Sequence, residues 1–302
     1  MKAPALDIKS VRVAEEFKHE SQLFRAGFSP CGKIIAAVGV DTDVHLWNIE
    51  DKSKRSFQAH ETWISSLCFN PAGKHLYTAD YHGVIHSWDY LAGAPGKPRW
   101  TIPSADRDNV RALAVAGGGK FLVSAGDEGV IRIWDAATGK PLKQLAGHQE
   151  CVFSLAVQPG GKRLASGDLL GSIRKWEIPA WKSAGELDAR ILHTRKDNFI
   201  ADVGGVRSLA FSPDGNTLLS GGGGWKLSEG RFGEIIAWDT EGWKNTGGKI
   251  TASPVTAIAY SPNGAYVLVG TSTGLRSSHD KTGSARYLNA RSLAWAEAPA
   301  VS

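Results

Sequence analysis

The chain has 302 residues, enough for one large β domain with a sizeable core or for two domains of average size. It contains 35 Gly and 11 Trp, a combination typical of short strands joined by tight turns. The net charge of +5 is mild, and the nearest approach to a basic run is Lys52, Lys54 and Arg55. Because a nucleic-acid binder usually concentrates its basic charge, this pattern argues against one.

Cysteine usage and hydropathy indicate the compartment. Cys31, Cys68 and Cys151 are odd in number and widely spaced, which suits a reducing environment and predicts neither a disulfide framework nor a metal site. The segment from Met1 to Glu20 lacks the apolar stretch of a secretory signal, and no apolar run approaches the roughly 18 residues of a membrane helix. We therefore expect a cytoplasmic location and no membrane contact.

A short phrase recurs along the chain: an apolar residue, Ser or Asn, Pro, any residue, Gly and Lys, with some looser copies. Pro presets φ and Gly supplies a positive φ, so each copy predicts a tight turn between two strands. The six copies are Phe28–Lys33, Phe69–Lys74, Val115–Lys120, Val157–Lys162, Phe211–Asn216 and Tyr260–Ala265.

A second phrase of alternating apolar residues ending in Trp follows each of the first five copies. The alternation predicts a strand with one face packed against a neighbour. The tryptophans are Trp47, Trp88, Trp134, Trp176 and Trp238, with successive spacings of 41, 46, 42 and 62 residues. The first three spacings fit the period of roughly 40–45 residues of a four-stranded propeller blade.

Together the phrases resemble the WD40 family, with Gly147-His148 as its GH element and Trp88-Asp89, Trp134-Asp135 and Trp238-Asp239 as its WD dipeptides. The resemblance implies an all-β, WD40-type β-propeller of six recognisable four-stranded blades in a single domain spanning residues 1–302. The Ala- and Gly-rich repeats also look bacterial. The expected blades are residues 20–59, 60–105, 106–147, 148–193, 202–250 and 251–298, with residues 8–18 added to the last.

Within the second repeat we expect four strands, at Ile64–Phe69, His75–Ala79, Val84–Trp88 and Arg99–Ile102, here called a to d. Propellers of this family usually close by pairing one terminus with the other, so Val11–Lys18 is expected to complete the last blade. The alternative is that Ser292–Ala298 supplies that strand itself.

The resemblance also implies a buried hydrogen-bond relay in each blade, from His before strand a through Ser or Thr on strand b and Asp in the b–c turn to Trp on strand c. The relay is fragmentary here: Ala37 replaces Ser in the first repeat, His82 replaces Asp in the second and Leu170 replaces Asp in the fourth. The matching residues are His19, Asp41 and Trp47; His60, Thr78 and Trp88; Ser124, Glu128 and Trp134, with Asp106 at the His position; and His148, Ser166 and Trp176. Since these sets recur once per blade, we interpret them as structural and not as a hydrolytic triad. The nine His show no zinc-like spacing, so we predict no metal and no cofactor.

Three of the longest insertions fall in loops that the family fold places on one face, formed by the d–a and b–c connections, whereas Gly93–Pro98 is expected on the opposite face. The three are Thr194–Gly204, Gly222–Gly233 and Ser272–Gly283. Variable loops on a rigid scaffold often carry function, and aromatic residues beside Arg and Lys favour binding. The candidate contact residues come from these insertions and from positions at or just before the start of strand a. They are Trp63, Arg111, Phe153, Arg195, Arg207, Trp225, Lys226, Arg231, Phe232 and Arg276.

Two alternatives stay open. Trp225 and Phe232 could pack the loops onto each other, and the two arginines of strand a could pair with Asp80, Asp127 or Asp168 in neighbouring turns. We predict a non-catalytic scaffold within a larger assembly that binds a protein or peptide through an acidic or aromatic segment. The alternative functions are a hydrolase-type enzyme at the channel mouth and a nucleic-acid- or chromatin-associated subunit.

Overall fold

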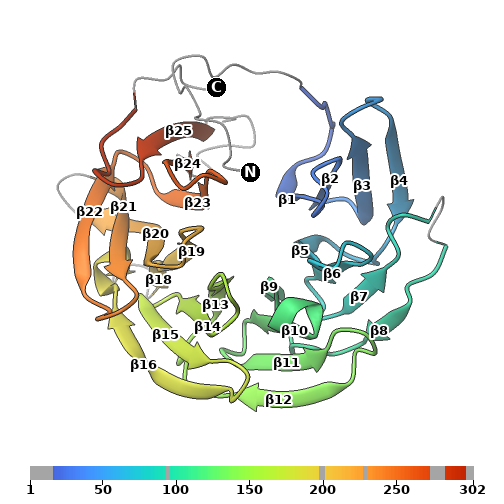
Figure 1. Cartoon of the computed structure of the whole chain (residues 1–302), viewed down its shortest axis with the longest axis horizontal. Helices are drawn as coiled ribbons and strands as arrows, with labels where there is room; N and C mark the ends of the chain where they lie inside the picture. The colour runs from blue at the N-terminus through green and yellow to red at the C-terminus, as the bar shows by residue number, and fades with distance from the viewer. Residues whose placement is uncertain (1–15, 93–95, 197–200, 227–229, 273–282, 297–302) are drawn as a thin grey trace. The chain divides into compact units, whose positions relative to one another are not determined.

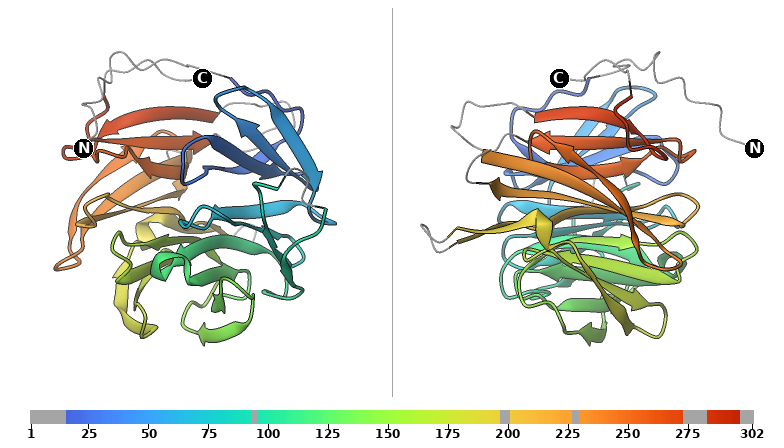
Figure 2. Two further views of the ribbon diagram at one scale, coloured as in Figure 1. Left: turned by 45° about the vertical axis from the view of Figure 1, so that its right-hand side comes forward. Right: turned by 90° about the vertical axis from the view of Figure 1, so that its left-hand side faces the viewer.

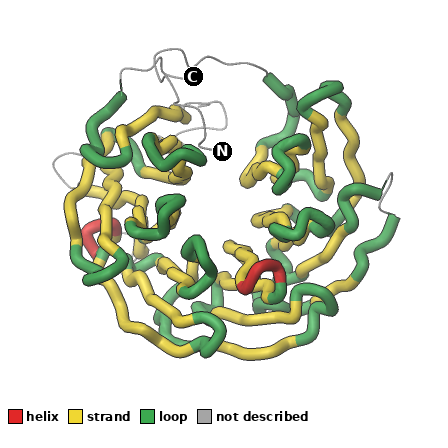
Figure 3. The backbone as a smooth tube through the Cα atoms, viewed as in Figure 1, coloured by secondary structure: helices red, strands yellow, loops and turns green. Residues whose placement is uncertain are grey.

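The computed structural model describes residues 16–92, 96–196, 201–226, 230–272 and 283–296. Contacts within the chain define two compact units, an N-terminal unit containing Glu16–Val152 and a C-terminal unit containing Phe153–Ser302. Both are built from antiparallel strands (Figure 1), and the helical segments in the described part are short 3-10 turns such as Gly117–Gly119 and Arg190–Leu192 (Figure 3). The prediction of a single domain across the whole chain stays a prediction.

The N-terminal unit contains three four-stranded sheets whose strands follow chain order from a to d. We call them blades 1 to 3. Blade 1 is β1 (Leu23–Phe28), β2 (Ile34–Gly39), β3 (Asp43–Asn48) and β4 (Lys54–Gln58). Blade 2 is β5 (Ile64–Phe69), β6 (Leu76–Asp80), β7 (Ile85–Trp88) and β8 (Trp100–Ile102), and blade 3 is β9 (Val110–Ala116), β10 (Phe121–Gly126), β11 (Ile131–Asp135) and β12 (Pro141–Leu145).

The C-terminal unit continues the same pattern with blades 4 to 6. Blade 4 is β13 (Val152–Val157), β14 (Arg163–Asp168), β15 (Ser172–Glu177) and β16 (Lys182–Asp188). Blade 5 is β19 (Val206–Phe211), β20 (Thr217–Lys226), β21 (Gly230–Asp239) and β22 (Asn245–Thr251), and blade 6 is β23 (Val255–Tyr260), β24 (Tyr266–Ser272) and β25 (Gly283–Asn289). Six successive antiparallel sheets of this kind are the blades of a β-propeller, as predicted.

The recurrent Pro-x-Gly phrase forms the a–b turns. Gly32 and Gly73 occupy these turns with φ of 73° and 79°, a left-handed conformation that other residues rarely adopt. In blade 3 the phrase lacks Pro, and the 3-10 turn Gly117–Gly119 replaces the β-turn. The a–b and c–d turns of a blade define one edge, here called the a–b edge, and the b–c turns and d–a connections define the opposite, b–c edge.

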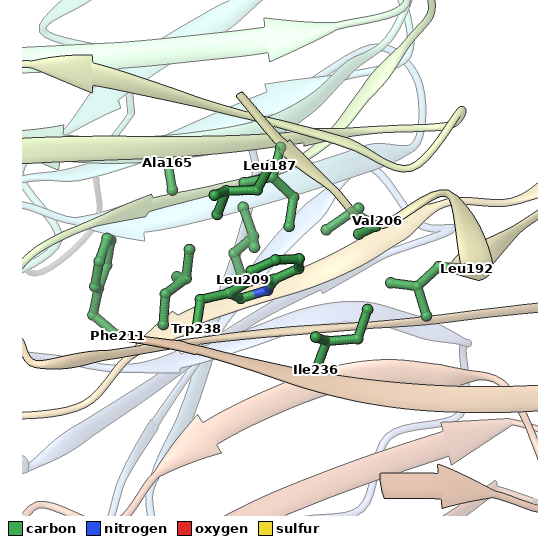
Figure 4. Close-up of a cluster of buried hydrophobic side chains, with 11 residues drawn as sticks. Ala165, Leu187, Leu192, Val206, Leu209, Phe211, Ile236 and Trp238 are labelled. Atoms are coloured by element: carbon green, nitrogen blue, oxygen red, sulfur yellow. The ribbon is translucent and has the colours of Figure 1, made fainter. Parts of the chain in front are cut away.

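Between adjacent blades the apolar faces of their strands form the core. Within the N-terminal unit, Ile64, Leu76 and Trp88 of blade 2 pack with Val38 and Leu46 of blade 1. In the C-terminal unit the side chains of Leu187, Leu209 and Trp238 converge between blades 4 and 5 (Figure 4). This packing buries the alternating apolar residues that defined the repeats.

Two connections predicted as loops contain strands instead. A two-stranded hairpin, β17 (His193–Lys196) and β18 (Ala201–Gly204), lies beside β20 (Figure 2). The second expected loop, Gly222–Gly233, extends β20 and β21 into a long hairpin in which Gly222 pairs with Glu234 and Trp225 pairs with Arg231. The loop prediction was wrong at both places because backbone pairing continues through the Gly-rich sequence.

The closing strand of blade 6 was expected at Val11–Lys18. Residues 11–15 of that segment lie outside the described residues, and Glu16–Lys18 are not in a strand. On β25, Leu288 forms an antiparallel bridge with Trp295, and the backbone N–H of Ala296 donates to the Tyr287 carbonyl at 2.9 Å. The residues around Trp295 thus pair where a fourth strand would lie, which favours the alternative that the C-terminal segment completes blade 6.

Candidate partner-binding surface

A complete buried relay is present in blade 2. His60 Nε2 lies 2.7 Å from Thr78 Oγ1, which also accepts a hydrogen bond from Trp88 Nε1 at 2.9 Å. His60 Nδ1 lies 2.8 Å from a carboxylate oxygen of Asp80, not from His82, which holds the expected Asp position. Asp80 ends strand b and also accepts from the backbone N–H groups of His82 and Val84. The expectation that blade 2 lacks the acidic member was therefore wrong, because the acid comes from two positions earlier.

The Trp–hydroxyl link recurs in the following blades. Trp134 donates to Ser124 at 2.8 Å, and Trp176 donates to Ser166 at 2.9 Å. In blade 5 Trp238 donates to Ser220 at 2.9 Å, a member that the sequence reasoning did not assign. Repeat tryptophans Trp47, Trp88, Trp134, Trp176 and Trp238 are all buried. His148 lies half-buried at the matching position of blade 4.

The Asp80–His60–Thr78 set has the order of an acid, a base and a hydroxyl, but it cannot act on a substrate as it stands. Thr78 is 0% exposed, and both partners are almost completely buried. The Thr78 hydroxyl oxygen already accepts the Trp88 N–H. A nucleophile needs access to the reacting atom, so this set stabilises the blade and does not form an active site.

An exposed aromatic cluster lies on the b–c edge of blades 1 and 2. It consists of Phe24 at the start of β1, Trp63 just before β5 and Tyr81 just after β6. The ring of Phe24 is 6.2 Å from those of both Trp63 and Tyr81, and the latter two are 5.6 Å apart, edge to face. Trp63 is 50% exposed and Tyr81 is 37% exposed, so the cluster presents apolar area to solvent.

The backbone fixes this cluster. The N–H of Tyr81 donates to the carbonyl of Trp63 at 3.1 Å, tying the two loops that carry the rings. Because large side chains on an ordered backbone lose little entropy on binding, such residues are favoured as contact anchors. Trp63 was a predicted contact residue. Tyr81 was not, because it lies in the short b–c turn just after β6 and not in one of the long insertions.

The predicted arginines of strand a already have partners. Arg111 on β9 forms an ion pair with Asp127 in the b–c turn of the same blade, one of the pairings that stayed open. Arg207 on β19 stacks over the ring of Phe153, with its guanidinium carbon 3.7 Å from the ring centroid. Phe153 is only 8% exposed beneath it. Phe153 is therefore part of the blade packing, and neither arginine is an unpaired cation.

The inserted hairpins of the C-terminal unit hold the remaining candidates. Arg195 on β17 is exposed and lies 2.5 Å from Asp202 on β18, which also contacts His193 at 2.7 Å. Phe232 is 7% exposed, so it packs the hairpin and does not face solvent. The side chains of Trp225, Lys226 and Arg231, and Arg276 as a whole, lie outside the described residues.

A pocket of about 440 Å³ lies on the other edge of the C-terminal unit, between the a–b turns of blades 5 and 6. Pro213 and Asp214 line it from one turn, and Pro262 and Asn263 from the next. Burial raises the pKa of Tyr260 at its wall. The two turns are copies of the repeated phrase, so the pocket follows from blade packing, and sequence reasoning did not single it out.

The repeat geometry agrees with the comparison to known proteins. The family described as "WD domain, G-beta repeat" matches residues 51–89, 96–135, 139–177, 194–226 and 246–282. These segments cover more than half of the chain. The chain therefore belongs to the WD40 repeat family.

Similar curated proteins match only over short segments. Jouberin of Rattus norvegicus is 27% identical over 89 residues, which is 28% of this chain and 8% of that protein. The U3 snoRNP-associated protein-like EMB2271 of Arabidopsis thaliana is 33% identical over 73 residues, 24% of this chain and 15% of that protein. Nuclear distribution protein nudF of Aspergillus terreus is 30% identical over 61 residues, 20% and 14% respectively. The matches thus span a small part of each relative.

Among the described residues, no helix has the length and apolar character needed to span a membrane.

Proposed function

We propose that the chain is a non-catalytic protein-interaction scaffold that binds a peptide segment of a partner on the b–c edge. The observation that carries the proposal is the exposed aromatic cluster of Phe24, Trp63 and Tyr81. The core does not require Trp63, because the ring lies outside the repeat positions and half of its surface faces solvent. Exposed tryptophan and tyrosine on a rigid backbone are the residues that dominate binding energy at interfaces.

The partner's anchor is better described as apolar or aromatic than as acidic. An acidic segment was expected from Arg111 and Arg207, but these side chains contact Asp127 and Phe153 within the chain. Asp127 neutralises the charge of Arg111, so this arginine attracts a second acid weakly. The guanidinium face of Arg207 is covered by Phe153. The net charge of +5 still favours an acidic flank around an apolar anchor.

The hairpins β17–β18 and β20–β21 are proposed as a separate contact surface. The exposed Arg195 and the predicted contacts Trp225, Lys226, Arg231 and Arg276 belong to this proposed extension, in the C-terminal unit. Membership of a larger assembly and a cytoplasmic location are further parts of the proposal. A hydrolase-type activity has no support from the buried blade 2 relay, and a nucleic-acid role has only the positive net charge.

A selection from a phage-displayed random peptide library tests the proposal. The wild-type chain is expected to enrich peptides with a shared apolar or aromatic anchor, and Trp63→Ala/Tyr81→Ala is expected to lose them. Leu142→Ala is the matched control, because Leu142 on β12 is 52% exposed and lies away from the b–c turns. Equal enrichment by the double variant would show that the aromatic cluster is not the binding surface.

A further inference from the structure

Blade 1 differs from blade 2 in its polar side chains. His19, before strand a, occupies the place of His60, but Ala37 stands where blade 2 has the hydroxyl of Thr78. His19 Nε2 instead lies 2.8 Å from Asp41 Oδ2. A second imidazole, His45 on β3, places its Nε2 3.0 Å from the same oxygen.

From these contacts we propose that His19, Asp41 and His45 form a binding site for a divalent first-row transition-metal ion, with zinc as the best-matched occupant. The three donor atoms lie within 4.8 Å of one another, and no other such group of three occurs among the described residues. Two imidazoles and one carboxylate are a ligand set that zinc and neighbouring metals accept, with water completing the shell.

The spacing of the donor atoms is close to that of a metal site. In a tetrahedral zinc site with bonds of about 2.0–2.1 Å, neighbouring ligand atoms are about 3.3 Å apart. The nitrogen–oxygen distances of 2.8 and 3.0 Å need to open by only a few tenths of an ångström. The rings of His19 and His45 are tilted by 45° to each other with centroids 4.0 Å apart, so both imidazoles already lie beside the shared carboxylate oxygen.

Asp41 has a carboxylate oxygen that could accept a further ligand. Its Oδ1 is buried and has no hydrogen-bond partner among the residues that the structure describes. An unsatisfied buried carboxylate oxygen carries a desolvation cost that a bound cation would remove. The side chain is 25% exposed, so an ion and its water can reach the site.

Ser56 on β4 is placed to orient the imidazole ring of His45. His45 Nδ1 lies 2.7 Å from Ser56 Oγ, and that hydroxyl can either donate or accept. When the ring binds a metal through Nε2, its Nδ1–H can donate to Ser56, an outer contact that orients metal-bound imidazoles. His45 therefore has the support that a ligand needs.

Lys54 opposes the metal. Its ammonium group lies 3.1 Å from His19 Nδ1 and can only donate, so this contact fixes the proton of His19 on Nε2, the atom that the metal needs. Binding requires the Lys54 side chain, which is on the exposed strand β4, to move away. Removing Lys54 should therefore tighten metal binding, which a purely structural Asp41–His19 pair would not predict.

Blade 2 supplies a matched control. His86 on β7 occupies the position of His45, two residues before the repeat Trp, and its ring is 4.4 Å from that of His60. Both nitrogens of His60 already contact Thr78 and Asp80, and His86 Nδ1 contacts Thr101 at 2.9 Å. The two imidazoles therefore do not converge on one carboxylate oxygen there, and we expect no metal.

The test is a zinc titration of the untagged, chelator-treated 302-residue chain in competition with a chromophoric chelator. We expect one equivalent of zinc to bind the wild type and His86→Ala alike, with at least about 100-fold weaker binding by His45→Ala and by the near-isosteric Asp41→Asn. Lys54→Ala should bind several-fold more tightly. Circular dichroism at matched temperature confirms that each variant is folded.

Cobalt(II) gives a second readout that reports the ligand set itself. A site of two imidazoles, one carboxylate and water should give visible absorption bands that His45→Ala and Asp41→Asn lose while His86→Ala keeps them. Absence of stoichiometric zinc binding by the wild type would overturn the proposal. So would binding that His45→Ala and Asp41→Asn leave unchanged.

Discussion

Two tryptophans of blade 2, Trp88 and Trp63, lie 25 residues apart in the sequence and serve opposite purposes. Trp88 is 2% exposed, donates its N–H to Thr78 and packs against Phe57 at a ring distance of 5.0 Å. Trp63 is 50% exposed and touches the rings of two other surface residues. A Trp that recurs in each blade thus stabilises the scaffold, whereas Trp63 lies outside the repeat positions and leaves half of its surface free for contact.

The largest expected effect is on Trp88. Trp88→Ala leaves a cavity in the core shared by blades 1 and 2 and leaves the Thr78 hydroxyl without its donor, so the free energy of unfolding should fall by about 3–5 kcal/mol. Chemical denaturation monitored by circular dichroism measures this loss. A loss below about 1 kcal/mol would remove the distinction between repeat and non-repeat tryptophans.

The next effect concerns the hydroxyl that holds Trp88. Thr78→Val keeps the shape of the side chain but leaves Trp88 Nε1 and His60 Nε2 without their buried partner, which should cost about 2–3 kcal/mol. Ser124→Ala in blade 3 is the comparison, because we infer only the Trp134 contact to be lost there. If both variants lose the same stability, the relay of blade 2 adds nothing to the Trp–hydroxyl link.

The relay around Trp88 and Thr78 was predicted only in part from the sequence. The tryptophans, the a–b turns and strand c recur once in each repeat with recognisable sequence phrases, so their positions were predicted. The acidic member of the blade 2 relay was missed because Asp80 lies two positions before the family position, at the end of strand b. Only the fold shows that its carboxylate still reaches His60.

The insertions were harder to predict. Gly221 and Gly222 are typical of loops, yet they lie in β20, where a Cβ on Gly221 would come within 2.5 Å of Ile258 in the next blade. Glycine is needed there for close packing and not for a turn. Likewise, His19, Asp41 and His45 are separated in the sequence and converge only through strand pairing, so no short motif indicated them.

A smaller expected effect is the pH dependence that His86 of blade 2 gives to the free energy of unfolding. Burial, with the nearby His60 adding to it, lowers the pKa of His86 from 6.5 to about 4. As the pH falls, His86 therefore binds a proton near pH 6.5 in the unfolded chain but only near pH 4 in the folded chain. The contribution of His86 to stability is fully present above pH 6.5 and is lost as the pH falls from 6.5 to about 4. Because His86 is partly exposed, we expect a loss on the order of 1 kcal/mol.

Denaturation curves of the wild type and His86→Gln at pH 7 and at pH 4.5 measure this contribution. The wild type should lose more stability than the variant over that interval. Parallel losses in the two proteins would mean that His86 does not titrate differently in the folded and unfolded chains.

The smallest expected stability effect is that of Trp63→Ala. Since the ring is half-exposed and outside the blade core, its removal should change the free energy of unfolding by less than about 1 kcal/mol. Thermal and chemical unfolding of Trp63→Ala beside Trp88→Ala make the comparison directly. A loss of the size expected for Trp88→Ala would mean that Trp63 belongs to the scaffold.

The most direct test of the central claim, that the exposed aromatic cluster binds the partner, is the Kd of a peptide selected on the wild-type chain. Trp63→Ala should weaken that peptide by about 30-fold, the value of a contact worth about 2 kcal/mol, while Leu142→Ala leaves the Kd unchanged. An unchanged Kd for Trp63→Ala, in a variant whose unfolding curve matches that of the wild type, would contradict the claim.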